Sequence, residues 1–326
     1  MMDNPNKKTI GVLTSGGDAP GMNAAVRAVV RTGITRGHRM MGIRRGYDGL
    51  LNGEIEELKL RSVSEILQRG GTVLLTARCE EFKTDEGLKR GVAMCHKMGI
   101  DGLVVVGGDG SFKGARNLSN AGIPCVGIPG TIDNDIASTE YTIGFDTALN
   151  TVVENVDRLR DTSHSHDRCS VVEVMGRHAG YIAVYAGIAC GALATLIPER
   201  PYDLDRDVIA RMRATLKTGK HHFIIIVAEG VGNSQEICNY IQEKSGIDTR
   251  LTILGHIQRG GTPTGQERVH ASVMGFRAIE LLEQGKGNRV VGIQNNRIVD
   301  YDINEALDMH KDIDEYLLRV AHEISI

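Results

Sequence analysis

Short hydrophobic runs recur along the chain, and each ends in a glycine-rich or acidic turn. Examples are "TIGVLTSGGD", "DGLVVVGGDGS", "IPCVGIPGTIDND", "CSVVEVMGRHAG" and "HFIIIVAEGVG". Segments with a helical pattern follow, among them "MNAAVRAVVRTGITRG" and "SQEICNYIQEKSG". Near-continuous Val and Ile runs are typical of strands covered on both faces, and the intervening helices indicate parallel crossovers. The pattern, over 326 residues, predicts an α/β chain of two three-layer α/β/α domains with mostly parallel, doubly wound sheets.

One segment, residues 180–198, is long enough to raise the question of a membrane span. "GYIAVYAGIACGALATLIP" contains no charged residue, and its length is close to the ~20 residues that cross a bilayer. It is rich in Gly and Ala and has no bulky apolar centre. We therefore expect a buried helix followed by a buried strand.

Composition and charge narrow the class of protein. The chain is 41% hydrophobic and 24% charged with a net charge of −3, as in ordinary globular proteins, and nothing in it indicates nucleic acid as a partner. The six cysteines are widely spaced without a CxxC pair, so we expect reduced thiols and a cytoplasmic location. The N-terminal "MMDNPNKKTIGV" lacks the apolar core of a signal peptide.

The glycine turns are the first candidate sites, because ligands of such sheets collect at the carboxyl ends of the strands. In "TSGGDAPGMN", Gly16 and Gly21 have P-loop spacing, but Met22 and Asn23 replace the Lys-Ser/Thr pair, which disfavours a P-loop NTPase. A glycine turn before a helix still suits phosphate, although it can equally be a turn without a ligand. In "VVVGGDGS", Asp109 lies between two glycines and is a candidate for Mg²⁺ on a polyphosphate.

"GTIDND" places two carboxylates at the tip of a predicted strand. One acid could accept the proton of a hydroxyl substrate while the other helps to hold a cation. Asp and Asn also favour helix caps and Asx turns, and spacing alone does not decide between these readings.

Cationic residues stand near several glycine turns. Arginine binds phosphate bidentately, and phosphoryl transfer depends on neutralising developing charge. A single such residue is more often a solvated surface group. The candidates are Arg78, Arg168, Arg177, Arg250, His256 and Arg259.

Taken in order, these motifs resemble those of the bacterial-type, ATP-dependent 6-phosphofructokinase family. The resemblance rests on "GVLTSGGDAPGMNAA", "RGGT", "VVVGGDGS", "GIPGTIDND", "YTIGFDTALNTVVENVDRLRDT", "VVEVMGRHAG", "VAEG" and "LGHIQRGGTPT". It implies a glycolytic kinase that moves the γ-phosphoryl of ATP, with Mg²⁺, to the 1-hydroxyl of fructose 6-phosphate. It also implies a cytoplasmic homotetramer with active sites shared between subunits.

The resemblance assigns roles to matching positions. Asp133 is expected to be the general base, with Thr131 and Asp135 beside it, and Arg78 and Arg177 to steady the transferring group. Asp109 and Asp135 are the metal candidates. The implied ATP site comprises Gly17, Tyr47, Arg78, Cys79, Gly108, Asp109, Gly110 and Ser111. The implied sugar-phosphate site comprises Thr131, Asp133, Asp135, Met175, Gly176, Arg177, Glu229, His256 and Arg259, with Arg168 and Arg250 acting from a neighbouring subunit.

The same resemblance implies a domain division and a phosphoryl donor. We expect a larger ATP-binding domain, 1–144 plus about 258–308, and a smaller fructose-6-phosphate-binding domain, 145–257 plus about 309–326. Pyrophosphate-dependent members of the family typically read "GGDD" and "PKTIDND", whereas this chain has Gly110 and Gly130, which favours ATP. Other readings are a lipid or NAD kinase and a sugar-binding module without catalysis. The cations of "GHIQRGG" and "MGRHAG" argue against the former, and Asp133 with Asp109 against the latter.

Only the implied effector site, for ADP and phosphoenolpyruvate between subunits, departs clearly from the family pattern. Matching cations are Arg27, Arg31, Arg160, Lys220 and His222, although Arg27 and Arg31 also fit a solvated helix face. The glutamate that meets the effector's Mg²⁺ is replaced by Leu193. Two lysines are replaced by Thr218 and His221, and an arginine by Leu60 with Arg61 adjacent. We therefore expect weak or absent activation by ADP.

Overall fold

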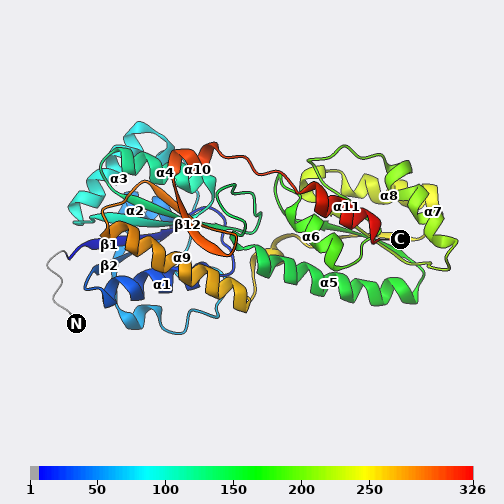
Figure 1. Cartoon of the computed structure of the whole chain (residues 1–326), viewed down its shortest axis with the longest axis horizontal. Helices are drawn as coiled ribbons and strands as arrows, with labels where there is room; N and C mark the ends of the chain where they lie inside the picture. The colour runs from blue at the N-terminus through cyan, green and yellow to red at the C-terminus, as the bar shows by residue number, and fades with distance from the viewer. Residues whose placement is uncertain (1–6, 326) are drawn as a thin grey trace. The chain divides into compact units, whose positions relative to one another are not determined.

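The computed structural model describes residues 7–325, so the ends of the expected domains at residues 1–6 and 326 lie outside the described residues. The chain divides into two compact units. The large unit comprises the described residues up to Ile132, Ile136–Thr147 and Arg259–Lys311. The small unit comprises Asp133–Asp135, Ala148–Gln258 and the described residues from Asp312 onward. Figure 1 traces the elements of each unit by colour.

The large unit is built on one predominantly parallel sheet. Its order is β12-β11-β5-β4-β1-β2-β3, with β6 paired to β5. Only the edge strands β3 and β12 run antiparallel to their neighbours. The strand order reverses between β1 and β4, and the crevice at such a reversal is where open α/β sheets bind ligands. The strands are β1 (Thr9–Thr14), β2 (Arg39–Ile43), β3 (Ile55–Leu58), β4 (Gly102–Gly107), β5 (Cys125–Thr131), β6 (Ile143–Gly144), β11 (Arg289–Gln294) and β12 (Arg297–Asp302).

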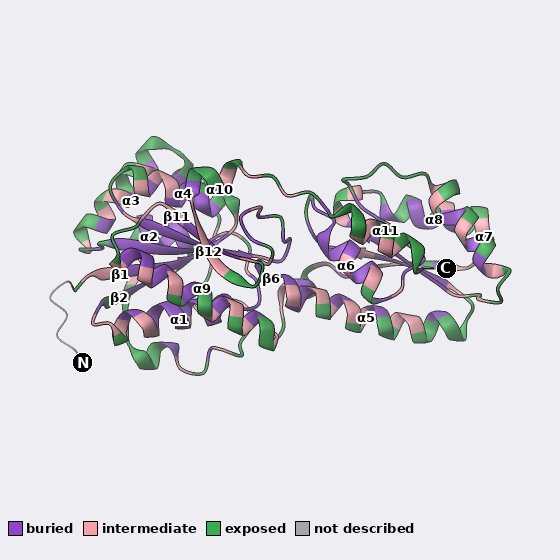
Figure 2. Cartoon of the chain, in the orientation of Figure 1, coloured by how far each residue is buried: buried purple, intermediate pink, exposed green. Residues whose placement is uncertain are grey.

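Helices cover both faces of this sheet. On one face α1 packs against α9, and on the other α4 packs against α3 and α10 (Figure 1). Strand β4 is buried throughout and β1 and β5 nearly so, as the purple strands of Figure 2 show, because alternate side chains meet different helical layers. The helices are α1 (Met22–Thr35), α2 (Gly46–Asn52), α3 (Asp85–Lys97), α4 (Asp109–Asn120), α9 (Gly265–Glu283) and α10 (Ile303–Asp308), with the short helical segments η1 (Leu60–Val63) and η2 (Glu81–Lys83).

The small unit repeats the architecture on a smaller scale. Its four strands are all parallel, in the order β10-β7-β9-β8. Alternate residues of β9, Phe223, Ile225 and Val227, join the apolar cluster that α7 and α8 cover, while α6 and α11 pack together. The elements are α5 (Phe145–Ser165), which begins in the large unit, β7 (Cys169–Val174), α6 (Tyr181–Ala189), β8 (Ala194–Leu196), η3 (Asp205–Ile209), α7 (Ala210–Leu216), β9 (Phe223–Ala228), η4 (Glu229–Val231), α8 (Ser234–Ser245), β10 (Thr249–Ile253), η5 (Gly255–Arg259) and α11 (Glu315–Glu323).

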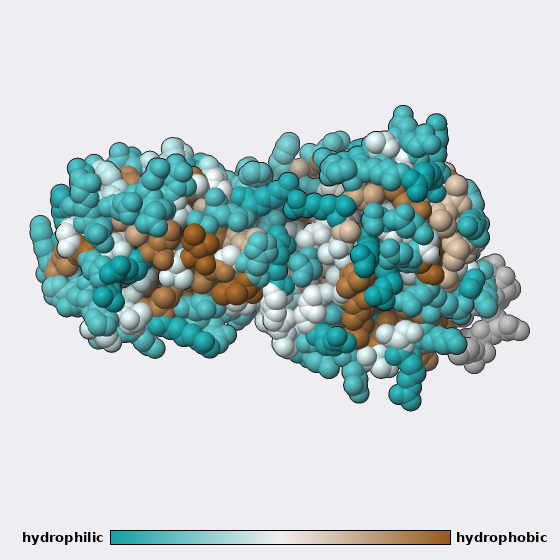
Figure 3. Space-filling model, turned by 180° about the vertical axis from the view of Figure 1, so that it is seen from behind, coloured by the Kyte–Doolittle hydropathy of each residue, from teal (hydrophilic) through white to brown (hydrophobic). Residues whose placement is uncertain are grey.

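The expected fold class is confirmed, and residues 180–198 form the expected helix and strand, although Ala194 and Thr195 of the strand are half-buried rather than buried. This segment forms α6 and β8 and lies largely buried. Within residues 7–325 we find no helix that is both long and apolar enough to span a bilayer. Figure 3 shows one face of the chain, on which apolar patches on both units are surrounded by hydrophilic side chains.

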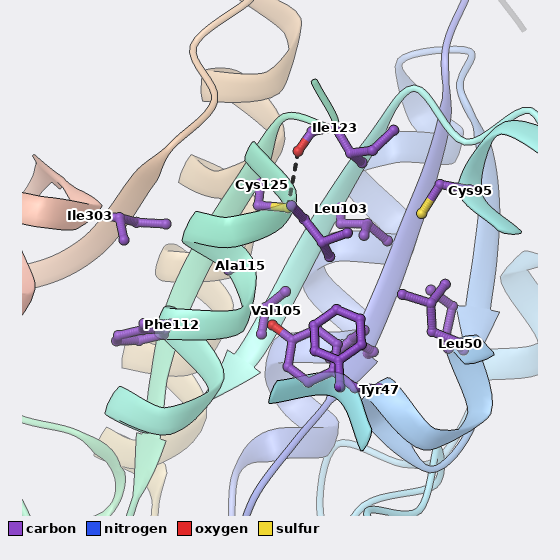
Figure 4. Packing of buried hydrophobic residues seen from close by; sticks show 14 of the residues in the cluster. Tyr47, Leu50, Cys95, Leu103, Val105, Phe112, Ala115, Ile123, Cys125 and Ile303 are labelled. Carbon is purple, nitrogen blue, oxygen red and sulfur yellow. Dashed lines mark hydrogen bonds between the residues drawn. The ribbon is translucent and has the colours of Figure 1, made fainter. Parts of the chain in front are cut away.

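The core of the large unit extends up to the glycine turns. Figure 4 shows Tyr47, Val105 and Phe112 together in one apolar cluster beside α4. The Tyr47 ring stacks on Phe82 at 4.1 Å between centroids and 8° between planes. Each such aromatic pair adds about 0.5–1.5 kcal/mol beyond its area burial. The turns therefore rest on rigid packing.

Candidate active site

The turn after β1 in the large unit, Ser15–Gly21, is held from two sides. The Ser15 amide donates to the Val106 carbonyl (2.9 Å), and its own carbonyl accepts from the Ser111 hydroxyl (3.1 Å). Gly16 and Gly21 have φ of 89° and 99°, a left-handed conformation that glycine adopts without steric cost. Gly17 is exposed. The turn thus presents its backbone at the end of β1 immediately before helix α1, as a phosphate site requires.

The turn after β4, the neighbouring strand, supplies Gly108, Asp109 and Gly110. Asp109 is the first residue of α4 and is exposed. A Cβ built on Gly108 or Gly110 would have no heavy atom within 4 Å, so the space beside both glycines is open. Ser111 is buried and linked to the first turn, so the structure brings together the two turns that sequence reasoning singled out.

Tyr47 was expected to line the nucleotide site. Its side chain is 5% exposed, and its hydroxyl donates to the Ser111 carbonyl at 2.6 Å. Burial raises the pKa of this phenol well above its usual range, with a smaller contribution from Cys125, so the hydroxyl stays a donor at neutral pH. Tyr47 therefore supports the start of α4, and its direct contact with a nucleotide stays a prediction.

The side chains of Thr76 and Asn23 link residues 69–79 to the first turn and to the start of α1. Thr76 donates its hydroxyl to the Gly16 carbonyl (2.8 Å). Asn23 accepts from the Val73 amide (2.7 Å) and donates to the Arg69 carbonyl (3.0 Å). The implied ATP residues Arg78, which is exposed, and Cys79, which is half-buried, follow shortly after.

The tip of β5 carries the proposed base. Thr131 is half-buried and pairs with Gly144 of β6, and its carbonyl accepts from the Thr142 hydroxyl (2.6 Å). Asp133 is 7% exposed, whereas Asp135 is exposed. Asn134 between them has φ 53°, and asparagine is one of the few side chains that tolerates this left-handed conformation. The turn therefore separates a nearly buried carboxylate from a solvated one.

In the small unit, the turn after β7 is held by one carboxylate. Glu229 Oε1 accepts from the amides of Gly176 (3.2 Å) and Arg177 (2.6 Å). The Arg177 backbone lies at φ 59°, an uncommon conformation for a residue with a Cβ, while its side chain is exposed. Two amide bonds to one carboxylate stabilise this strained turn, so Glu229 orients the backbone of the implied sugar site.

Gln258 is a residue that sequence reasoning missed. Its side chain is fully buried, accepts from the Met175 amide (3.2 Å) and donates to the Gly255 carbonyl (3.0 Å). It therefore joins the turn after β7 to η5, which carries the exposed His256. In the sequence, only its position within "LGHIQRGG" pointed to Gln258 as a site residue.

Arg168 and Arg250 are brought together by neighbouring strands. Arg168 Nε donates to Asp248 Oδ2 (2.6 Å), and Arg250 Nε lies 3.1 Å from Asp248 Oδ1. Desolvation acts to raise the pKa of Asp248, but the Arg168 hydrogen bond and both arginine charges outweigh it and lower this pKa. The two guanidinium groups already share one anion, an arrangement suited to an incoming phosphate.

Arg259 was expected to line the sugar site. It belongs to the large unit and donates to the Asp18 carbonyl (3.2 Å). A Cβ built on Gly17 would lie 2.5 Å from its Nη1, so the guanidinium covers the first glycine turn. Its direct role toward a sugar phosphate stays a prediction.

The carboxylates of the candidate site can be compared with the ligands that the implied magnesium ion prefers. Within residues 7–325, we find no cluster of three or more His, Cys, Asp or Glu side chains able to hold a metal ion. Mg²⁺ usually keeps several waters and takes only one or two carboxylates together with substrate phosphates. The exposed Asp109 and Asp135 are single carboxylates of this kind, so the residues fit an ion carried in with a nucleotide.

Three of the cations matched to the effector site, Arg160, Lys220 and His222, lie close enough in the small unit for their charges to interact. In the small unit, Arg160 donates to the Cys190 carbonyl, and His164 Nδ1 lies 3.2 Å from His222 Nδ1. Burial followed by the Arg160 charge lowers the pKa of Lys220. In the large unit Arg27 and Arg31 are half-buried, and burial followed by the Arg31 charge lowers the pKa of Arg27. Leu193 is different, because it is 1% exposed within the apolar cluster of β9.

Comparison with known proteins identifies the family. Residues 9–282 match the family model described as Phosphofructokinase. ATP-dependent 6-phosphofructokinases of Clostridium botulinum and Bacillus cereus are each 57% identical over 98% of this chain, covering 99% and 100% of their own lengths. The structure of phosphofructokinase from Saccharomyces cerevisiae matches 98% of the chain with a TM-score of 0.88 and 36% identity, although the chain spans only 48% of that protein. The chain therefore belongs to the phosphofructokinase family.

Proposed function

We propose that this chain transfers the γ-phosphoryl group of ATP to the 1-hydroxyl of fructose 6-phosphate, giving fructose 1,6-bisphosphate and ADP. The observation that carries the proposal is the 57% identity to relatives named ATP-dependent 6-phosphofructokinase over nearly their whole length. The two joined glycine turns at the strand reversal and the nearly buried Asp133 support it. In this scheme the enzyme acts in glycolysis, in the cytoplasm.

In the proposed mechanism the large unit holds the nucleotide. The backbone amides of the turns after β1 and β4 bind the phosphates, while Arg78 and Cys79 line the site. A magnesium ion held near Asp109 and Asp135 would neutralise phosphate charge when bound. Arg78 and Arg177 would stabilise the charge that develops on the transferring group.

Asp133 would accept the proton of the 1-hydroxyl as the oxygen attacks phosphorus. Removal of a carboxylate from this position should lower kcat without weakening substrate binding. We therefore compare Asp133→Ser with wild type, using Asp308→Ser as the control for an exposed carboxylate that has no place in the proposed site. Turnover by Asp133→Ser close to that of wild type would remove Asp133 from the role of base.

The phosphoryl donor is tested separately. The open space beside Gly110 supports a nucleoside triphosphate, because an acidic side chain at that position would occupy the space and repel the α-phosphate. A coupled assay with fructose 6-phosphate should show turnover with ATP and none with pyrophosphate. Turnover with pyrophosphate alone would overturn the choice of donor.

The assembly and its regulation complete the proposal. The family's shared sites imply a homotetramer in which Arg168 and Arg250 bind the 6-phosphate of a neighbouring subunit's substrate. The ADP response should be weak or absent, because Leu193 is an apolar core residue where the family places a metal-binding glutamate. Strong, magnesium-dependent activation by ADP would contradict this.

A further inference from the structure

A buried carboxylate behind the glycine turn of the large unit has no place in the mechanism above. Glu267 lies in the first turn of α9 and is 3% exposed. Its amide donates to the hydroxyl of the N-cap residue Thr264 at 3.1 Å. A buried acid is costly unless donors are directed at it, so the contacts of this side chain indicate what it does.

The carboxylate of Glu267 caps another helix. Its Oε2 accepts from the amide (3.2 Å) and the hydroxyl (3.1 Å) of Thr147 in the first turn of α5, and the carboxylate also accepts from the Gly144 amide. In return, Asp146 of α5 accepts from the Thr264 hydroxyl at the start of α9. The Glu267 carboxylate thus caps α5, whose N-terminus favours its negative charge, and Asp146 links the start of α5 to the N-cap residue of α9.

The same side chain contacts both segments that the proposed chemistry requires in this unit. A Cβ built on Gly21, the last residue of the glycine turn, would lie 2.8 Å from Glu267 Cγ and 2.8 Å from Ile143 Cγ2. Ile143 and Gly144 form β6, which pairs with Gly130 and Thr131 at the tip of β5. One carboxylate therefore stands behind the phosphate turn and behind the strand that leads into the proposed base.

We propose that Glu267 is a positioning residue for phosphoryl transfer, whose anionic carboxylate fixes the Gly21 turn and the β5 tip relative to each other. The inference rests on the proposed function for its effect on rate, but its structural part is independent of that function. The residue is expected to touch neither substrate. It holds two segments of the large unit, the Gly21 turn and the β5 tip, in a fixed relative position. This matters for the rate because misplacement of reacting groups by about 1 Å can cost on the order of 100-fold.

The anionic form is the one that holds the network. Three donors point at the carboxylate, and protonation would turn one of its oxygens into a donor. Burial raises the pKa of Glu267 to about 7, against the hydrogen bonds from Gly144 and Thr147 that lower it, and the neighbouring Asp146 adds a small increase. One turn further along α9, His270 has its own pKa lowered by burial, while Asp146 acts to raise it. The charge on Glu267 is therefore expected to change close to neutral pH.

The test compares Glu267→Gln, Glu267→Asp and wild type, with Glu280→Gln as a control for a surface carboxylate on the same helix. We expect Glu267→Gln to lower kcat about 10- to 100-fold, with KM for each substrate changed less than about 3-fold. The acidic limb of the wild-type kcat profile, with a midpoint near pH 7, should be absent from Glu267→Gln. Glu267→Asp should keep that limb and recover part of kcat, and Glu280→Gln should match wild type. An unchanged kcat and acidic limb in Glu267→Gln would overturn the proposal.

Hydrogen exchange separates this inference from the proposed activity. In Glu267→Gln, the amides of Gly144 and Thr147 should exchange about 10-fold faster than in wild type at pH 8, whether or not the protein turns over fructose 6-phosphate. If the wild-type protein is inactive and these amides still exchange faster in Glu267→Gln, the proposed activity is refuted while the structural role of Glu267 is supported. Unchanged exchange would refute the positioning role even in an active enzyme. If Glu267→Gln does not fold, kcat and the exchange of these two amides are measured in Glu267→Asp. Values equal to wild type in both measurements would refute the positioning role.

Discussion

The substitution Gln258→Met gives the sharpest stability test of the small unit. Methionine has nearly the shape of glutamine, so the change opens no large cavity and removes only two hydrogen bonds. These are the bonds to the Met175 amide (3.2 Å) and the Gly255 carbonyl (3.0 Å). A buried polar group left without a partner costs about 1–3 kcal/mol. Met175 is buried, whereas Gly255 is half-buried and can bind water, so we expect a total of about 2–4 kcal/mol.

Differential scanning calorimetry checks this magnitude. At about 2–4 °C for each kcal/mol, Gln258→Met should lower the melting temperature of the transition that includes the small unit by roughly 5–15 °C. Under the proposed function, KM for fructose 6-phosphate should also rise, because the turn at Met175 loses its tie to η5. The control is Gln235→Met, which replaces an exposed glutamine on α8 whose side chain donates to Asn239. A melting temperature of Gln258→Met within about 1 °C of wild type would show that loss of the hydrogen bonds to Met175 and Gly255 does not cost the expected free energy.

Three further predictions concern the glycine turns, the histidine pair and the buried acid. Gly107→Ala would place a Cβ against the Ser15 carbonyl and 2.5 Å from the Ser111 hydroxyl oxygen. It should cost about 1–3 kcal/mol and raise KM for ATP, and an unchanged KM would contradict this. The pKa of His222 is lowered by burial and next by the charge of His164. His164→Ser should therefore raise it, as NMR titration would show, and a fall or no change would count against the charge effect. Burial raises the pKa of Glu267 to about 7 from 4.5. Between pH 4.5 and pH 7 the folded state binds a proton on Glu267 that the unfolded state has lost. Protonation of Glu267 therefore adds about 3 kcal/mol to the free energy of unfolding below pH 4.5, and this contribution is lost as the pH rises through 7. Urea unfolding at pH 5 and pH 8 should show this loss in wild type and not in Glu267→Gln.

The fold was predictable because its signals are local. Val and Ile runs such as "LVVVG" and "FIIIVA" form strands that are buried on both faces, as their lack of polar alternation indicates. Positive φ favours glycine at Gly16 and Gly21 after β1, and the close approach of Ser15 and Ser111 favours it at Gly107, the last residue of β4. Residues 180–198 could be assigned to a buried helix and strand because small side chains pack closely in a core.

The support of the site was not predictable from the same patterns. Gln258 and Glu267 are polar residues that look like surface positions in the sequence, and only the tertiary structure shows their burial. Tyr47, assigned to the nucleotide site from the sequence, packs within the core and binds the Ser111 carbonyl, contacts that no motif indicated. The hydrogen bonds that define the roles of Glu267 and Gln258 join residues far apart in sequence, namely 147 with 267 and 175 with 258.

These supporting contacts also decide how mutations in the motifs should be interpreted. Glu229 holds the amides of Gly176 and Arg177, so a loss of substrate affinity in a Glu229 variant would not by itself show contact with the sugar. A direct contact and a displaced turn differ in what they change: the former acts on one substrate, and the latter also alters the exchange and stability of the turn. The same distinction applies to Arg259, which binds the Asp18 carbonyl and covers Gly17. In this chain, charged side chains from elements distant in sequence hold the backbone of the motifs in place.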